Sequence, residues 1–587
     1  MKEVFDILFM KGDLLNLLRL WDTFVWAIPA DGDLLDYLFD KYGDLMHQLE
    51  AVADSRDYIN PFIGTGGHGH TYPGATVPFG MVQLSPDTRK DSWDGCSGYH
   101  YSDSVILGFS HTHLSGTGVG DYGDIRFMPM VGEVKVEPGS ANNPDSGYAS
   151  RFTHDMEMAK AGYYAVHLQD YDIYVGLTTT ERAGFHKYLF PKTDDAHIVV
   201  DLKESITSEE IISSEIKIES DYAISGFRRT NGWASDQFLY FYAEFSEPFN
   251  SFGIVESGVQ KEGQKSAKGK NLKAWFDFST DSRTVILVKV GISAVDVNGA
   301  KNNLLTEIPS WNFDSVKSVT QAKWTKQVEK IKIEGGTEKQ REIFYTALYH
   351  TMLAPNLYVD VDGRYRGHDL KKHQAKGFNM YTVFSLWDTF RTLHPLLSII
   401  ERDRTNDFIL SMLDMYKHDG LLPVWELAAN ETNCMIGYHS VPVIVDAYVK
   451  GINGFDAPKA LRAMQVSANA RQFGLTEYKK KGYIPADKEG ESVSKTLEYA
   501  YDDWCIAEMA RLLEQDDIYK EFIQRAQYYK NIYDKETGFF RGKSNGCFVT
   551  PFNPTEVNFM LTEANTWQYN FFVPHDINTH IEMLGGD

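Results

Sequence analysis

The sequence predicts a multidomain α+β fold, with an N-terminal antiparallel β-sandwich, a helical linker and a C-terminal toroid or bundle of helices. Two observations predict it. Short alternating runs, separated by clusters of Gly, Asn, Asp and Ser, fill residues 55–305, as in sandwiches of antiparallel sheets. From residue 337 onward, apolar residues recur at helical spacing in one segment after another, which is typical of paired helices joined by loops.

Residues 1–54 are expected to form a helical N-terminal extension of unknown role. They are rich in Leu, Phe and Trp, but charged residues such as Lys11, Asp13 and Arg19 interrupt them. A signal peptide needs a basic start, an uninterrupted apolar stretch and small residues at the cleavage site. This segment lacks that order, so no signal peptide is visible in it.

The β-sandwich is expected to span residues 55–305. Its clearest strands are the alternating runs at 163–180, 197–203, 238–245 and 283–293. The alternation places apolar side chains on one face of each strand, so these runs predict the core between two sheets.

A charged, helix-forming linker at 306–336 and a helical domain at 337–587 complete the expected organisation. The following helices are predicted by their apolar period: 338–354, 461–474, 494–514 and 520–534. A toroid of paired helices gathers its loops at one end, where a binding site can form.

Composition excludes some classes of partner. The formal net charge of the 587 residues is −23, and such an acidic surface repels nucleic acid and anionic lipid. No apolar run approaches the roughly 18 residues of a membrane span. Aromatic residues make up 13% of the chain, which suits either stacking on neutral sugar rings or a large aromatic core.

Two Gly-rich segments near the N-terminal end carry candidate binding residues. Trp93 lies in the segment DSWDGCSGYHYSD, where a loop tryptophan either stacks on a ligand or anchors the loop by burial. The histidines of this region are closely spaced and allow either a zinc site or, with more support, hydrogen bonding in a polar pocket; they are His68, His70, His100, His111 and His113.

Three segments of the helical half carry carboxylates beside aromatic residues. In SLWDTFRTLHPLL, Trp387 and Asp388 open a helix, where Asp can also serve as a cap. In LPVWELAANETNCMIGYH, Glu426 and Glu431 are expected in a loop before a helix, where clustered carboxylates can bind hydroxyl groups or tune each other's protonation.

Glu563 is the candidate proton donor. It lies in LTEANTWQYNFFVPHD among Trp567, Tyr569 and Phe571. An apolar setting raises the pKa of a carboxyl group, as a general acid requires near neutral pH. A surface Glu close to a helix cap is the alternative.

Taken together, these blocks resemble glycoside hydrolase family 92. The resemblance rests on NPFIGTGGHGHTYPGATVPFGMVQLSPDT, GCSGYHYSD, GFSHTHLSGTGVGDYGD, SLWDTFRTLHPLL, LPVWELAANETNCMIGYHSVPVIVDAY, TLEYAYDDW and EANTWQYNFFVPHD, in the family's order over residues 58–587. It implies a β-sandwich, a helical linker and an (α/α)6 toroid with the active site between the two domains.

The resemblance also implies a role for each candidate residue. Glu563 matches the family's general acid, and Trp93 matches a loop tryptophan associated with α-1,2-linked substrates. The remaining residues are expected to bind substrate in the pocket for the terminal mannose: Trp387, Asp388, Glu426, Glu431, Asn565, Gln568, His575 and Asp576.

The implied activity is hydrolysis of terminal α-linked mannose, with inversion and with Ca²⁺ as cofactor, on mannan or N-glycans. Family members are usually periplasmic or secreted. The family's later blocks, which carry the general base and most calcium ligands, are expected beyond Asp587, so the toroid is expected to be incomplete and this chain to have low or no activity.

Two further functions remain open from the sequence. One is a mannan-binding protein without catalysis, since Trp93 and much of the expected pocket are present. The other is an amidase that releases glycans from asparagine, although the four cysteines occur in no recognisable Cys-His-Asp order.

Overall fold

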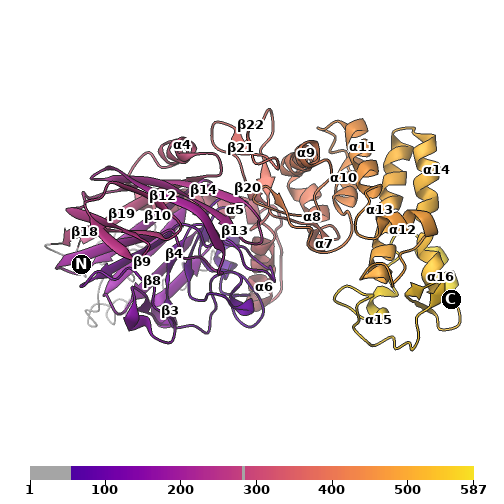
Figure 1. Ribbon diagram of the computed structural model, residues 1–587, viewed down its shortest axis with the longest axis horizontal. Helices are drawn as coiled ribbons and strands as arrows, with labels where there is room; N and C mark the ends of the chain where they lie inside the picture. The colour runs from indigo at the N-terminus through magenta and orange to yellow at the C-terminus, as the bar shows by residue number, and fades with distance from the viewer. Residues whose placement is uncertain (1–53, 281–283, 587) are drawn as a thin grey trace.

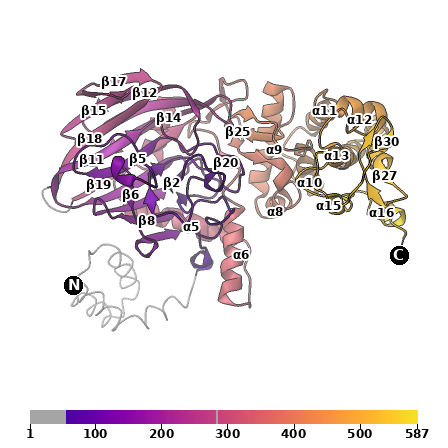
Figure 2. The ribbon, with the colours of Figure 1, turned by 60° about the horizontal axis from the view of Figure 1, so that its bottom comes forward.

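The computed structural model describes residues 54–280 and 284–586. Both ribbon views place the β-sandwich at one end of an elongated molecule and helices α13 (Ser492–Leu512) and α14 (Asp516–Arg525) at the other (Figures 1 and 2). The multidomain α+β prediction is therefore confirmed. The predicted helical extension lies outside the described residues, apart from Asp54.

The N-terminal domain is built from two antiparallel sheets. In the described part of the chain, the first sheet has eight strands, in the order β1 (Ala75–Thr76), β2 (Gln83–Asp87), β4 (Gly108–Ser110), β5 (Arg126–Val131), β11 (Thr193–Asp201), β18 (Leu272–Thr280), β15 (Ser251–Glu256) and β16 (Val259–Glu262). The second, counted over the same residues, has nine, in the order β17 (Ser266–Gly269), β12 (Glu210–Ser220), β13 (Ala223–Asn231), β14 (Gln237–Phe245), β19 (Thr284–Ser293), β10 (Ala183–Phe190), β9 (Ile173–Thr179), β8 (Tyr163–Leu168) and β7 (Glu157–Lys160).

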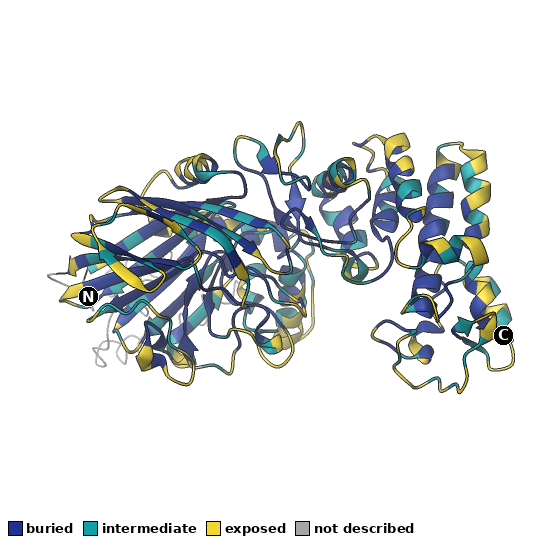
Figure 3. Cartoon of the chain, viewed as in Figure 1, coloured by how far each residue is buried: buried dark blue, intermediate teal, exposed yellow. Residues whose placement is uncertain are grey.

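The core of this domain lies between the sheets (Figure 3). Phe245 of β14 and Phe276 of β18 belong to different sheets, and their ring centroids are 5.4 Å apart. Burying one such side chain contributes about 1.5–3 kcal/mol. The alternating runs predicted as strands form β8, β9, β11, β14 and β19, so their apolar faces do pack together.

Three helices connect the sandwich to the rest of the chain. Helix α4 (Val297–Glu307) packs on β19, and α5 (Phe313–Val328) is followed by α6 (Glu338–His350). Trp324 of α5 is fully buried, and its indole N–H donates to the Thr76 carbonyl over 2.7 Å. Helix α5 therefore docks directly on the sandwich, while α4 begins within the range expected to be sandwich.

The helical region has a helix at each predicted place, but the helices predicted at 461–474 and 520–534 begin about four residues earlier and end at Ala468 and Arg525. In chain order its helices are α7 (Leu386–Thr389), α8 (Leu393–Ile400), α9 (Arg402–Asp419), α10 (Ser440–Val449), α11 (Ala457–Ala468), α12 (Leu475–Lys481), α13, α14, α15 (Thr566–Tyr569) and α16 (Ile577–Met583). Helix α13 is buried on most of its surface and packs on α10, α11 and α14, so it is central to this region. No described helix is long and apolar enough to cross a membrane.

Short strand pairs lie between these helices. They are β20 (Asn356–Leu357) with β23 (Tyr381–Thr382), β21 (Arg364–Arg366) with β22 (Lys372–Gln374), and β24 (Phe384–Ser385) with β25 (Trp425–Leu427) and β26 (Asn430–Glu431). The expected loop around Glu426 and Glu431 is thus wrong, because these residues pair across the β25–β26 hairpin.

Candidate active site

A cavity of about 160 Å³ lies where the sandwich meets the helical region. The sandwich contributes the loop at 115–117, and the helical region contributes Asp388, His394 and Trp425. Gly116 in that loop has φ of +77°, a conformation that glycine adopts without strain. The cavity therefore occupies the junction at which a site was expected.

The two regions also bind each other directly beside this cavity. Trp233 of the sandwich contacts Trp425 with ring centroids 4.2 Å apart. Asn430 Oδ1 accepts hydrogen bonds from the Ser235 hydroxyl and the Asp236 amide, both over 3.1 Å. These contacts fix one wall of the cavity relative to the other.

Two histidines that line the cavity have ring nitrogens without a partner. In the described part of the chain, both ring nitrogens of His394 lack a hydrogen-bond partner. The Nε2 atom of His350 lacks one there as well. Burial lowers the pKa of each ring to about 4, so both are neutral at pH 7. Buried polar atoms are normally satisfied, so these nitrogens are exceptions among the residues that line the cavity.

Trp93 stands beside the cavity loop. It lies in a short 3-10 helix, is 56% exposed, and packs edge-on against His70 with centroids 4.5 Å apart. His70 in turn contacts the carbonyl of Thr117, a cavity residue, over 2.7 Å. The exposed ring excludes the buried-anchor alternative and leaves an aromatic face open to a ligand.

The other histidines of the Gly-rich segments are held by hydrogen bonds. His68 contacts Asp94 over 2.6 Å, and His100 contacts Ser102. His111 and His113 contact the carbonyls of Ile125 and Gln83. Each therefore has a hydrogen-bond partner, in a loop or, for His113, on strand β2, as the hydrogen-bonding interpretation predicts.

Asp388 is an exposed carboxylate in the cavity wall. It lies on α7, a helix of four residues, and accepts a hydrogen bond from the Ser385 hydroxyl. This short helix places Asp388 in the lining of the cavity. Its neighbour Trp387 turns the other way, and its indole N–H donates to Glu498 over 3.1 Å. One residue of this pair therefore faces the cavity, and the other anchors the helix.

Glu498 belongs to a buried charged network that sequence reasoning did not single out. Its Oε1 accepts from Trp387 and from the Tyr569 hydroxyl, and its Oε2 lies 2.6 Å from His439 Nε2. The other nitrogen of His439 lies 2.8 Å from Asp502. Burial opposes the charge of His439, but the two carboxylates outweigh it and raise its pKa to about 9.

The surroundings of Glu563 differ from the expectation. Burial raises the pKa of the Cys434 thiol, and the charges of Asp388, Glu563 and Glu431 act in the same direction. Glu563 does not line the 160 Å³ cavity with Asp388. Glu563 itself is exposed, as are Trp567 and Phe571. The predicted apolar enclosure of Glu563 is wrong for the described residues, because Glu563 and these two rings are exposed, and Tyr569 is buried against Glu498 instead.

Asn565 and Gln568 hold α15 together. The Asn565 side chain accepts from the Gln568 amide over 3.2 Å, and the Gln568 side chain accepts from the Asn565 amide over 2.9 Å. This reciprocal cap satisfies two N–H groups at the start of the helix. It also fixes the segment that follows Glu563.

Glu426 and Glu431 receive backbone hydrogen bonds on the β25–β26 hairpin. Glu426 is fully buried and accepts from the Thr382 hydroxyl and from the amides of Val383 and Ala429. Glu431 accepts three backbone amides, and burial raises its pKa. Among the residues that line the 160 Å³ cavity, neither glutamate occurs.

His575 packs beside Tyr501 of α13, and Asp576 follows it in the chain. His575 Nε2 contacts the Ala526 carbonyl over 2.8 Å, and burial lowers the pKa of this ring to about 4. Asp576 accepts from the Tyr529 hydroxyl over 2.8 Å. The structure does not bring this pair to the cavity with Asp388.

The described residues do not assemble an evident ligand set for Ca²⁺. Within them, the only group of three or more His, Cys, Asp or Glu side chains close enough to share one cation is Asp369, His373 and His418. Two of its three donors are imidazole nitrogens, whereas Ca²⁺ takes oxygen ligands. This cluster therefore does not fit the calcium that the resemblance implies.

Comparison with known proteins identifies the family. The model of the glycosyl hydrolase family 92 N-terminal domain matches residues 58–293, and that of its catalytic domain matches residues 299–587. An uncharacterized secreted glycosidase of Arthroderma benhamiae is 27% identical, over 91% of this chain and 72% of the relative.

Solved structures agree. The family GH92 α-mannosidase BT3965 of Bacteroides thetaiotaomicron superposes with a TM-score of 0.88 at 41% identity, over 91% of this chain and 73% of that one. The same enzyme has been solved with mannoimidazole, at 40% identity to this chain over 91% of it and 72% of that one, with a TM-score of 0.88. The family GH92 inverting mannosidase BT2199 of the same organism superposes with a TM-score of 0.84 at 31% identity, over 91% of this chain and 72% of that one. The two domain matches and these relatives show that the chain belongs to glycoside hydrolase family 92.

Proposed function

We propose that this protein hydrolyses terminal α-linked mannose residues of mannan or N-glycans. The observation that carries the proposal is the cavity between the two domains, which is lined by an exposed carboxylate, Asp388, and by His350 and His394, whose rings carry nitrogens without a partner in the described part of the chain. Sugar hydroxyls both donate and accept hydrogen bonds, so they match this mixture of groups. The mannosidase names of BT3965 and BT2199, and the mannoimidazole complex of BT3965, support mannose as the sugar.

Glu563 is proposed as the general acid. Its charge and that of Asp388 both raise the pKa of the Cys434 thiol, and it is free to reach a ligand because it is exposed. A sugar bound beside it would exclude water and favour the protonated carboxyl group. The reaction needs that proton on the leaving glycosidic oxygen.

Inversion is proposed on the resemblance and is supported by the description of BT2199 as an inverting mannosidase. It requires a second carboxylate on the opposite face of the sugar, about 6.5–9.5 Å from the acid. No described residue is assigned this role. Because the described residues offer no evident Ca²⁺ ligand set, no step of the reaction is assigned to calcium either.

Specificity for α-1,2 linkages is proposed through Trp93, whose exposed ring stands beside the cavity loop. An aromatic face there can stack on the sugar next to the terminal mannose. Export from the cell is proposed as well, since the relative from Arthroderma benhamiae is described as secreted.

The pocket is tested by calorimetric titration with mannoimidazole. The unaltered protein should bind it, and Asp388→Asn should weaken binding by about 10-fold or more, since a charge-assisted hydrogen bond contributes roughly 1.5–3 kcal/mol. Asp403→Asn, an exposed Asp in the first turn of α9, is the matched control and should change nothing. Equal affinities of all three proteins for mannoimidazole would show that the sugar binds outside this cavity.

The reaction is tested by mannose release from α-1,2-mannobiose in the presence of added Ca²⁺. Proton NMR of the first product distinguishes inversion from retention. Binding of mannoimidazole without any release of mannose would favour the mannan-binding alternative. Release of an intact glycan from a glycopeptide would favour the amidase.

A further inference from the structure

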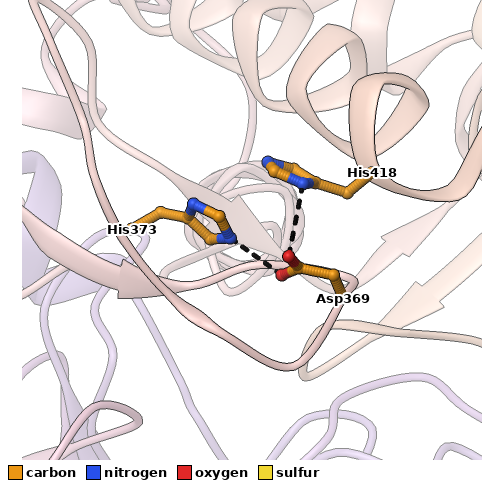
Figure 4. Close-up of side chains that lie close together, drawn as sticks. All are labelled: Asp369, His373 and His418. Atoms are coloured by element: carbon orange, nitrogen blue, oxygen red, sulfur yellow. Dashed lines mark hydrogen bonds and ion pairs between the residues drawn. The ribbon is translucent and has the colours of Figure 1, made fainter.

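A second polar cluster lies outside the cavity, where the β21–β22 hairpin meets the end of α9. Asp369 and His373 belong to the hairpin, and His418 belongs to the last turn of α9 (Figure 4). His373 Nε2 lies 2.8 Å from Asp369 Oδ1, and His418 Nδ1 lies 3.7 Å from Asp369 Oδ2. The three side chains point toward one another, with one ligand atom from each within 4.8 Å of the others.

The donor set selects a particular kind of cation. Two imidazole nitrogens and one carboxylate suit Zn²⁺ and neighbouring transition metals, which bind at about 2.0–2.2 Å from such atoms. Ca²⁺ prefers six to eight oxygen ligands. The observed separations need to change only slightly for one small cation to contact all three groups.

The surroundings of His418 also suit a metal ligand. Its Nε2 is buried without a hydrogen-bond partner in the described part of the chain, and Asp414 Oδ2 lies 3.6 Å away. Metal-bound histidines commonly donate their second N–H to a carboxylate, and Asp414 stands ready for that role. The two ring nitrogens of His418 face different carboxylates, with Nδ1 toward Asp369 and Nε2 toward Asp414, so Nδ1 is the nitrogen that would bind the metal.

The electrostatic setting favours a cation. His418 lies in the last turn of α9, where the helix dipole is negative. One lysine, Lys371, lies 3.8 Å from Asp369 Oδ2, and its side chain is 78% exposed. It can turn into solvent when a metal takes its place.

We propose that Asp369, His373 and His418 bind one divalent transition-metal cation of the Zn²⁺ type. The cation would tie the β21–β22 hairpin to α9. The same hairpin is bound to the sandwich, because Arg366 donates to the Ala294 carbonyl and Arg364 pairs with Asp296, both over 2.8 Å. The metal would therefore brace the junction of the two domains without taking part in the hydrolysis.

The test uses untagged protein stripped of metal and titrated separately with Zn²⁺ and with Ca²⁺. Calorimetry should show one Zn²⁺ per chain, and thermal unfolding should shift to higher temperature with Zn²⁺, since a ligand that binds only the folded state stabilises it. Co²⁺ should give the visible absorption of a nitrogen-ligated site. Ca²⁺ should not compete for this site.

Two variants decide the outcome. His373→Ala and His418→Ala should each weaken Zn²⁺ binding by at least about 10-fold, and His373 is partly exposed on a hairpin, so its loss leaves the fold intact. His167→Ala is the matched control, because His167 contacts Asp172 over 3.0 Å outside any three-ligand cluster. The proposal is overturned if the unaltered protein binds no Zn²⁺ at micromolar concentration, or if His373→Ala binds it equally well.

Discussion

Trp387 donates its indole N–H to Glu498 Oε1 over 3.1 Å, and this bond fixes the helix that presents Asp388 to the cavity. The same oxygen accepts from Tyr569, on the helix that follows Glu563. A single buried carboxylate thus holds both the helix that carries Asp388 and the helix that follows Glu563. Glu498 is a positioning residue, since it does not line the cavity.

Replacing Glu498 by Gln should therefore reduce both stability and activity. The variant keeps the shape of the side chain but removes the charge that His439 faces, at a cost of about 1–3 kcal/mol. The melting temperature and kcat should both fall. Glu508→Gln, on the same helix but paired with Arg511 near the surface, should change stability by less than about 1 kcal/mol. Equal effects of the two variants would remove Glu498 from this role.

Stability should fall as the solution becomes alkaline. The pKa of His439 is raised from 6.5 to about 9 in the folded protein. Its contribution is therefore fully present below about pH 6.5 and is lost as the pH rises through 9, and it amounts to about 3 kcal/mol at most. Between pH 7 and 9, the melting temperature of His439→Gln should decline less steeply than that of the unaltered protein. An identical slope in both would contradict a charged His439; His167→Gln serves as the control.

His394→Phe should separate binding from folding. The substitution keeps a ring of similar size and removes two buried nitrogens that have no partner in the described part of the chain. Removing an unsatisfied polar group is neutral or stabilising for folding, so the melting temperature should stay or rise. The KM for α-1,2-mannobiose should rise by roughly 5-fold or more, since a hydrogen bond to substrate is lost. A lower melting temperature with unchanged KM would show a purely structural histidine.

Trp93→Ala should affect substrate binding more than stability. The ring is 56% exposed, so its removal exposes little core. The KM for α-1,2-mannobiose should rise roughly 3–10-fold if the ring stacks on the sugar. Trp311→Ala, at an exposed tryptophan that packs on Lys289, is the matched control and should leave KM unchanged.

The two-domain fold was predictable because long strands and helices have distinct apolar periods. The runs that became β14 and α13 each extend over several turns or pleats, so their patterns are unambiguous. The β25–β26 hairpin was missed because strands of two or three residues have no measurable alternation. Short elements of this kind form only when tertiary contacts hold them.

The site was predictable in part. Motifs single out Asp388 and Glu563, and in the structure Asp388 lines the cavity while Glu563 is exposed. The role of His394 was not predictable, since its missing partners appear only once the cavity has formed. The sequence does carry one signal for Glu498: it stands four residues before Asp502 in α13, so both charges face the same side of the helix.

The central claim, that Glu563 donates the proton, is tested most directly by Glu563→Gln. The amide has the size of the carboxyl group but cannot act as the acid. In a protein that also carries the family's later blocks, release of mannose from α-1,2-mannobiose should fall by about 10²–10⁴-fold. Cleavage of an aryl mannoside with a good leaving group should fall less, and mannoimidazole affinity should stay within a few-fold. Undiminished release from mannobiose by the variant would contradict the assignment of Glu563.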